Sequence, residues 1–260
     1  MITKTGIAIV VFLLAGFGAV HAADAPVQLK PSTAIAPDIE AFPRLVAAPG
    51  DNAAVRINQA LDRRDAVVKK AAKDCRKQSD RPAEADWSRS ITVTMRGPAY
   101  ISFTANDSWF CGGAHPDSSA MALVYDLQTG APVNWARLLP AALVKGTSLD
   151  NAGDGTSIGL VSSPVLQDLM VKAEMADAAN PLDPDCKDVV SDPEVKLSLW
   201  PDAKAGGLAV QPASLIHAVA ACGDSVVIPT ATLRKLGVSA ALLDAIDVAH
   251  TAGFYDRDQP

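Results

Sequence analysis

Histidine, cysteine and serine side chains are the groups in this sequence that could carry chemistry. Residues 111–117 read C-G-G-A-H-P-D, so one histidine stands in a glycine-rich segment closed by proline. An imidazole titrates near neutral pH and can donate or accept hydrogen bonds at a recognition surface. Glycine and proline disfavour a regular helix or strand here, which places the histidine on a shaped loop. The candidate binding residues of this loop are Gly112, Gly113, His115 and Asp117.

The alternative for this loop is structural, with the His115 ring bonded to backbone and holding the shape of the turn. A catalytic alternative also exists, because residues 155–159 read G-T-S-I-G, the nucleophile-elbow pattern of serine hydrolases. That elbow requires a buried strand directly before the serine, whereas residues 149–154 are polar and turn-forming. Ser157 therefore fits a helix N-cap better. A small envelope hydrolase would need His115 to converge with Asp117 or Ser157 in one pocket, and we favour a protein without catalytic activity.

Metal-binding patterns are weak in this chain. His115, His217 and His250 lie far apart, and none has a histidine or carboxylate partner at the spacing of a zinc site. Residues 150–155, D-N-A-G-D-G, resemble the start of a calcium loop, but alanine occupies the third position and valine the twelfth. We therefore expect no metal site and no cofactor.

The four cysteines are Cys75, Cys111, Cys186 and Cys222. Their spacing is too long for the C-x₂-C or C-x₄-C pairs of metal sites, and an even number in an exported chain favours two disulfides. Four cysteines allow three connectivities. We predict the pairs 75–111 and 186–222, because each pair then closes a local loop in one half of the chain.

Residues 1–22 are typical of a secretory signal peptide. Lys4 precedes an apolar run over residues 6–20, and small residues precede a cleavage site after Ala22. An apolar run of this length is short of the roughly 20 residues that span a bilayer, and later apolar runs are broken by polar residues. We therefore expect a periplasmic or secreted protein that is not stably inserted in the membrane after signal cleavage.

Composition excludes several classes of partner. The 260 residues are 49% hydrophobic and 20% charged, which is typical of a globular protein. There are 23 Lys and Arg against 29 Asp and Glu, a net charge of −6, which argues against nucleic acid and anionic membranes as partners. Aromatic residues make up only 5%, so no stacking platform for bases is expected. A basic protein partner is compatible with this charge.

The periodicity of apolar residues and the positions of glycine and proline predict the helices and strands that hold the candidate residues. Residues 23–50 carry five prolines and form an extended leader, which either packs late or not at all. Asp51 or Asn52 caps a helix that runs to about Arg76. Its solvated face is expected to carry Arg56, Arg63, Asp65 and Lys70.

Alternating apolar residues predict a hairpin over 91–105, turned at residues 97–98, and a third strand with apolar residues at 121, 123, 125 and 127. A helix over 158–176, interrupted at Pro164, follows. Short strands are expected near 195–200, 207–210, 215–221 and 226–228, with closing helices near 231–236 and 240–248. Strict βαβ alternation is absent, so we predict an α+β fold, mainly an antiparallel sheet packed with helices, as a single domain over residues 51–260.

Three short motifs carry a resemblance to a known family. They are G-G-A-H-P at 112–116, Y-D-L-Q-T-G at 125–130 and L-L at 138–139. In order and spacing they resemble an exported bacterial domain family of unknown function, which includes the lysozyme-sensing extracellular domain of the anti-sigma factor RsiV and the non-catalytic domain of PdaC-type peptidoglycan deacetylases. The motifs span about thirty residues, and the surrounding order of helix and strands is similar over roughly residues 50–250.

The resemblance implies an α+β domain that binds at the cell envelope, with any catalysis residing in other domains. The chain lacks the transmembrane helix of an anti-sigma factor and lacks a deacetylase domain. The implied partner is a lysozyme-type muramidase or a peptidoglycan fragment, and an acidic chain favours encounter with a basic muramidase over an anionic glycan. The matching residues themselves look structural, with glycines for the turn and Asp126, Thr129 and Gly130 for the bend. A purely structural domain without a ligand remains a further alternative.

Overall fold

The computed structural model describes residues 25–151, 157–179, 181–213 and 215–256, so the predicted signal peptide lies outside the described residues. The helices are α1 (Asn52–Gln78), α2 (Trp135–Leu138), α3 (Pro164–Ala176), α4 (Pro184–Val190), the 3₁₀ helix η1 (His217–Cys222), α5 (Thr230–Lys235) and α6 (Ala240–Ala252). The strands are β1 (Leu29–Lys30), β2 (Arg44–Leu45), β3 (Asp86–Arg96), β4 (Tyr100–Phe110), β5 (Asp117–Asp126), β6 (Gly146–Asn151), β7 (Ser157–Ser162), β8 (Lys196–Asp202), β9 (Gly207–Ala213) and β10 (Val226–Pro229). The fold is α+β, as predicted.

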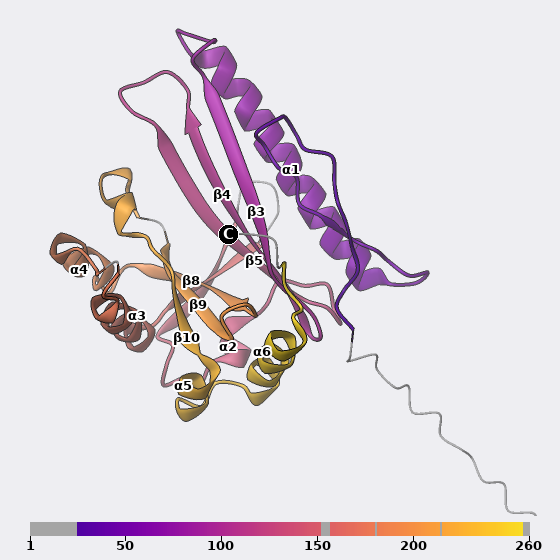
Figure 1. Ribbon diagram of the computed structural model, residues 1–260, viewed down its shortest axis with the longest axis vertical. Helices are drawn as coiled ribbons and strands as arrows, with labels where there is room; N and C mark the ends of the chain where they lie inside the picture. Colours follow the sequence, from indigo (N-terminus) through magenta and orange to yellow (C-terminus); the bar gives the residue numbers. More distant parts are fainter. Residues whose placement is uncertain (1–24, 152–156, 180, 214, 257–260) are drawn as a thin grey trace, which may run out of the picture.

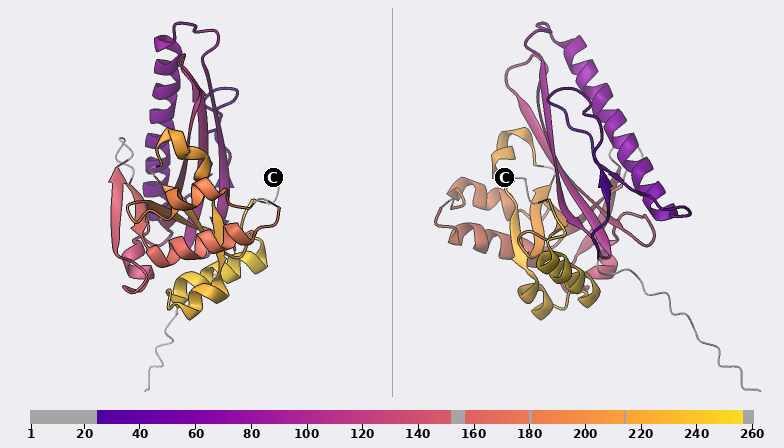
Figure 2. Two further views of the ribbon diagram at one scale, coloured as in Figure 1. Left: turned by 90° about the vertical axis from the view of Figure 1, so that its left-hand side faces the viewer. Right: turned by 45° about the vertical axis from the view of Figure 1, so that its right-hand side comes forward.

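Two antiparallel sheets form the body of the molecule. Long strands make a three-stranded sheet in the order β3-β4-β5, and a five-stranded sheet has the order β10-β9-β8-β7-β6. In Figure 1, α1 runs along the three-stranded sheet, whereas α3 and α4 lie beside the five-stranded sheet, with α5 and α6 at its lower end. The three-stranded sheet extends well beyond the second sheet in the upper part of both views of Figure 2.

One face of the three-stranded sheet is covered by α1. Asp51 caps this helix, since its carboxylate accepts from the Ala54 backbone N–H. Ile57 and Leu61 on one face of the helix are fully buried against Phe103 and other apolar side chains of β3, β4 and β5. The predicted helix, hairpin and third strand are therefore confirmed.

The opposite face of the three-stranded sheet has two different halves. Its inner half packs on the five-stranded sheet through apolar residues such as Tyr100, Ala122 and Val124. Met95 belongs to this second core, although the alternation placed it with Ile91 and Val93. The difference arises because a register shift between Val93 and Met95 turns the following side chain to the other face. The outer half carries polar side chains, described below.

The proline-rich leader packs against the domain. Its backbone pairs through β1 and β2, and Ile39 forms a parallel bridge with Arg89 beside β3. Phe42 is fully buried between α1 and the sheet, with its ring edge-on to Phe103 at 5.6 Å. Of the two alternatives for this segment, the packed one holds for the described residues, and its extended, irregular character is as expected.

Several sequence-based assignments in the C-terminal half are wrong. Residues 149–151, expected to be turn-forming, belong to the strand β6. Residues 157–162 form the strand β7, and the helix begins only at Pro164, because proline is favourable at a first helical position. Ser163 caps that helix, so the predicted N-cap role of Ser157 is incorrect. The segment near 215–221 is the 3₁₀ helix η1 instead of a strand, and α4 is a helix that the sequence patterns did not predict.

Both predicted disulfides are present. Cys75–Cys111 joins the end of α1 to the end of β4, and Cys186–Cys222 joins α4 to η1. Each closes a chain separation of 36 residues. Disulfides persist mainly in oxidising compartments, which is compatible with export. None of the described helices has the length and apolar character needed to cross a bilayer.

Candidate functional site

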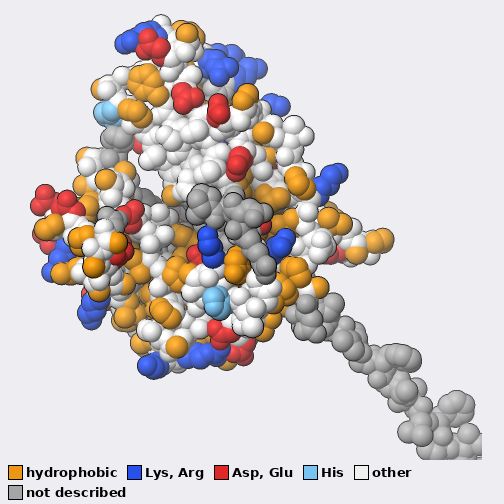
Figure 3. All heavy atoms as spheres, viewed as in Figure 1, with side chains coloured by type: hydrophobic (Ala, Val, Ile, Leu, Met, Phe, Trp, Pro, Cys, Tyr) orange, Lys and Arg blue, Asp and Glu red, His pale blue; other side chains and the backbone are white. Residues whose placement is uncertain are grey.

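A groove lies where the outer half of the three-stranded sheet faces η1 and the end of β9. Its volume is about 870 Å³, within the range of ligand sites. Hydroxyl and amide side chains of the sheet form its floor, namely Ser88, Ser90, Asn106, Ser108 and Ser118. The opposite wall consists of Gln211, Pro212, Ala213, Leu215, Ala220, Ala221, Gly223 and Asp224. Figure 3 shows this region hollowed and mostly uncharged, between the upper part of the molecule and its lower left part.

No motif of the sequence predicts this groove, although the strand β5 carries a signal of it. On β5, the even-numbered apolar residues Val124 and Ala122 of the inner half give way to Ser118 in the outer half, where the neighbouring positions of β4 are Asn106 and Ser108. A sheet face that packs on a second sheet is apolar, so the change marks the point where that contact ends. All three of these polar residues are exposed.

The outer edge of β5 forms part of the same groove. Val124 accepts from the Val133 backbone N–H, so the even-numbered residues of β5 direct their backbone groups away from β4. Ser118 and Ala120 continue this pattern in unbroken register with β4 and are exposed. The Ser118 N–H is bonded to the Asp117 carboxylate, and β4 is the sole strand paired with this part of β5 among the described residues.

The charge of the groove is acidic at its rim. Asp38 and Glu40 of the leader stand at the β3 side, and Asp224 stands at the η1 side, all three exposed. The single cationic residue among the described lining residues is Arg89, whose side chain has no exposed surface and is paired with Asp65 and Asp107. A ligand in the groove therefore meets carboxylates and neutral polar groups.

The predicted binding loop, residues 111–117, lies at the outer end of the sheet. None of its residues lines the groove, and the first lining residue after it is Ser118 of β5. His115 is exposed, and its Nδ1 lies 3.2 Å from the Pro116 carbonyl oxygen. Gly112 has a φ of +79°, and a Cβ there would lie 2.6 Å from the Ser79 hydroxyl. A Cβ on Gly113 would meet nothing within 4 Å. The turn accounts for a glycine at 112, and binding by Gly112, Gly113, His115 and Asp117 stays a prediction.

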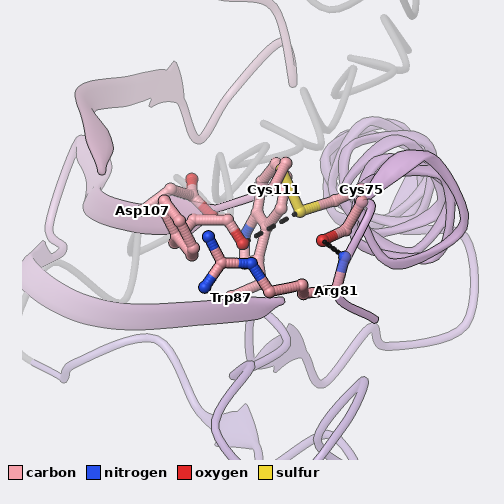
Figure 4. The surroundings of a disulfide bond; sticks show 7 residues. Cys75, Arg81, Trp87, Asp107 and Cys111 are labelled. Atoms are coloured by element: carbon pink, nitrogen blue, oxygen red, sulfur yellow. Dashed lines mark hydrogen bonds between the residues drawn. A yellow bond between two sulfur atoms is a disulfide. The ribbon is translucent and has the colours of Figure 1, made fainter. Parts of the chain in front are cut away.

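The surroundings of the Cys75–Cys111 disulfide show how this loop is held. The bond fixes the start of the loop to the end of α1, and the loop follows directly after β4 (Figure 4). Trp87 stacks on Trp109 across the β3–β4 pair at 5.0 Å, and its indole N–H donates to Asp107. These contacts hold the end of the β3–β4 hairpin in place.

The Y-D-L-Q-T-G motif is structural, as the resemblance implied. One oxygen of Asp126 accepts from the backbone N–H groups of Gln128 and Thr129 and from the Thr129 hydroxyl. Gly130 has a φ of +70°, and a Cβ there would lie 2.5 Å from the Ala53 carbonyl oxygen. The motif therefore closes the turn after β5 tightly against the start of α1.

Asp65 is buried, so its expected place on a solvated helix face is wrong. It accepts from the guanidinium of Arg44 at 2.7 Å and from that of Arg89 at 3.2 Å. Arg89 also lies over the Phe42 ring, 4.6 Å from its centroid. The spacing along α1 concealed this role, because both partners lie in other elements. The network joins the leader, α1 and β3, which gives Asp65 a structural function.

His115 and Ser157 belong to different parts of the fold. His115 lies on the turn between two strands of the three-stranded sheet, whereas Ser157 begins β7 in the five-stranded sheet. His250 bonds through Nδ1 to the Ala203 carbonyl oxygen at 2.8 Å. Within the described residues, no group of three or more His, Cys, Asp or Glu side chains has an arrangement that could hold a metal ion.

No protein-family model matches this sequence, and no curated protein matches it. Among solved structures, the chain is similar to a member of the DUF3298 family from Bacteroides fragilis, with a TM-score of 0.48 and 12% sequence identity. The likeness covers 79% of this chain and 86% of that one. At this level no residue role is transferred. The resemblance to RsiV and PdaC stays a prediction.

Proposed function

We propose that this protein is an exported binding protein of the bacterial cell envelope, and that its groove holds a segment of a basic partner protein. The observation that carries the proposal is the groove itself, with a floor of hydroxyl and amide groups, carboxylates at both rims and a single buried, paired cation among its described lining residues. Complementary charge steers encounter and selects against anionic ligands.

A lysozyme-type muramidase is the partner that this chemistry favours. Such enzymes are basic, and the resemblance of the G-G-A-H-P and Y-D-L-x-T-G motifs to a lysozyme-sensing domain supports the same class. The exposed edge of β5 offers backbone groups to an extended segment, a mode in which main-chain hydrogen bonds provide affinity. A peptidoglycan fragment would suit the hydroxyl floor, but its acidic groups would face Asp38, Glu40 and Asp224.

The experiment is calorimetry of residues 23–260, disulfides intact, with a c-type lysozyme at low and physiological salt. We expect saturable binding that persists at physiological salt, together with inhibition of wall lysis. Binding that disappears with salt would reduce the interaction to general charge attraction. Binding of a soluble peptidoglycan fragment without binding of lysozyme would replace the proposed partner.

Two variants locate the site. Ser108→Trp fills the groove floor at an exposed strand position, and we expect it to weaken lysozyme binding at least tenfold. Val55→Trp introduces the same bulk on the exposed surface of α1, away from the groove, and is the matched control. If His115→Ala abolished binding while Ser108→Trp preserved it, the site would be the 111–117 loop instead of the groove.

A further inference from the structure

A smaller pocket adjoins the groove and contains an unpartnered buried carboxylate. This Glu174 pocket has a volume of about 430 Å³ and shares Ala221 and Asp224 with the groove. Its remaining lining residues are Glu174, Asp177, Pro181, Leu182, Asp183, Cys186, Cys222, Ser225 and Val226. The Cys186–Cys222 disulfide therefore forms part of its wall.

Glu174 is only 7% exposed, and neither of its carboxylate oxygens has a hydrogen-bond partner among the described residues. It lies in the last turn of α3, where the helix dipole disfavours negative charge, and that turn contains no basic residue. Burial, and then the neighbouring charge of Asp224, raise the pKa of the Glu174 carboxyl to about 7. The fold thus buries an acidic group under conditions that all oppose its charge.

The other described groups around the pocket add negative charge and no positive charge. Asp177 follows α3, Asp183 precedes α4, and Asp224 lies between η1 and β10. One oxygen of Asp177 accepts from the Ala179 N–H, and one of Asp183 accepts from the Asp185 N–H. The described lining includes no lysine, arginine or histidine. Glu174 and Asp224 are therefore the carboxylates best placed to receive a cation.

We propose that the Glu174 pocket receives a lysine or arginine side chain of the partner segment held in the groove. This inference rests on the proposed function and gives it a specificity pocket. A charge-assisted hydrogen bond would supply the partner that the buried carboxylate lacks, and a cation beside Asp224 would relieve repulsion between the two acids. The pocket and the groove share the lining residues Ala221 and Asp224, so they are adjacent and one bound chain can occupy both.

The size of the Glu174 pocket and the arrangement of its carboxylates favour an organic cation over a metal ion. The described carboxylates do not form a group of three at metal-binding distances. A volume of about 430 Å³ exceeds what a single metal ion fills and accommodates an alkylammonium or alkylguanidinium group. The pocket is therefore matched to the end of a long basic side chain.

The first test uses no protein partner. The Glu174 carboxyl carbon is followed by NMR in a pH titration of the disulfide-intact chain, with and without n-butylammonium or n-butylguanidinium chloride. We expect saturable binding in the millimolar range and a lowered pKa of Glu174, since a bound cation favours the carboxylate. Tetramethylammonium chloride, which donates no hydrogen bond, should leave this pKa unchanged. An equal effect of tetramethylammonium, or tight binding of Ca²⁺ instead, would overturn the proposal.

The second test uses the lysozyme complex. Glu174→Gln should weaken binding at pH 8 at least tenfold, whereas Glu194→Gln, at an exposed position outside the pocket, should not change it. Near pH 7, binding to the unaltered chain should release protons, measured by calorimetry in buffers of different ionisation enthalpy, and Glu174→Gln should abolish that release. Amine binding without lysozyme binding would retain the pocket and overturn the proposed partner. Lysozyme binding that Glu174→Gln leaves intact would retain the partner and overturn the pocket.

Discussion

The two halves of this molecule treat a buried carboxylate in opposite ways. In the N-terminal half, Asp65 on α1 is bonded to Arg44 and Arg89. In the C-terminal half, Glu174 on α3 has no hydrogen-bond partner among the described residues. Each half also contains one disulfide, and the two disulfides close the same chain separation. The halves therefore differ in whether the buried carboxylate is hydrogen-bonded, and not in the number of their disulfides.

We interpret Asp65 as a structural charge and Glu174 as a functional one. A buried charge is tolerated when it is paired and hydrogen-bonded, and Asp65 meets that condition with groups from two other elements. A buried carboxylate without a partner lowers stability, and groups with such perturbed pKa values cluster at functional sites. In the N-terminal half the Asp65 network joins the leader, α1 and β3, and in the C-terminal half Glu174 lines the pocket that we propose to receive a basic side chain.

The largest expected effect tests the structural side of this comparison. Asp65→Asn removes the charge that pairs with Arg89, whose side chain is fully buried. Arg89 would then keep only Asp107, whose carboxylate oxygen lies 3.8 Å from its Nε. Breaking one of the two buried pairs should cost about 3 kcal/mol in the free energy of unfolding, measured by urea denaturation at pH 7.

Asp62→Asn is the matched control, because Asp62 pairs with the same Arg44 but its side chain is 66% exposed. Its loss should cost less than about 1 kcal/mol. Similar effects of the two substitutions would show that the Asp65 network is not a special support of the N-terminal half.

The disulfides give a second, intermediate test. Replacing either cysteine pair by serine should lower the free energy of unfolding by about 2–4 kcal/mol, because the two loops have the same length. Only loss of the Cys186–Cys222 bond should also weaken lysozyme binding, since that bond lines the Glu174 pocket. Equal losses of affinity from the two variants would contradict the role of the Glu174 pocket in recognition.

The sequence was sufficient to predict most elements of the N-terminal half. Apolar residues recur at helical spacing after Asp51 and alternate with polar residues along much of β3, β4 and β5. These patterns are strong signals, because each element buries one face. In the C-terminal half, residues 157–162 and 215–221 were misassigned. Short apolar runs do not distinguish strand from helix, and burial decides between them only when their neighbours are known.

The candidate site was harder to predict, for a physical reason. The groove lies between segments that are about a hundred residues apart, such as Ser108 and Gln211, so no local pattern contains it. Asp65 and Glu174 look alike in sequence, each an acidic residue within an amphipathic helix. The difference between them depends on whether arginines from distant elements reach them, which becomes visible only in three dimensions.

The smallest expected effect concerns the pH dependence of stability in the C-terminal half. The pKa of Glu174 is raised from 4.5 to about 7 in the folded chain, so the folded state retains a proton that the unfolded state releases between these values. The contribution of this group to stability is fully present below pH 4.5 and is lost as the pH rises through about 7. Glu174→Gln keeps the neutral form at every pH. The variant should match the unaltered chain near pH 4.5 and exceed its free energy of unfolding by about 1–2 kcal/mol at pH 8.

Urea denaturation at the two pH values measures this difference, with Glu194→Gln as the exposed control that should show none. Asp65→Asn should show the contrasting behaviour, a loss of stability at pH 7, because its carboxylate already has cationic partners. A variant at position 174 that is destabilised at both pH values would mean that Glu174 supports the fold as Asp65 does. The contrast between the halves would then vanish, and with it the reason to place a cation in the pocket. If Glu174→Gln is more stable and binds lysozyme more weakly, the same carboxylate both lowers stability and provides recognition.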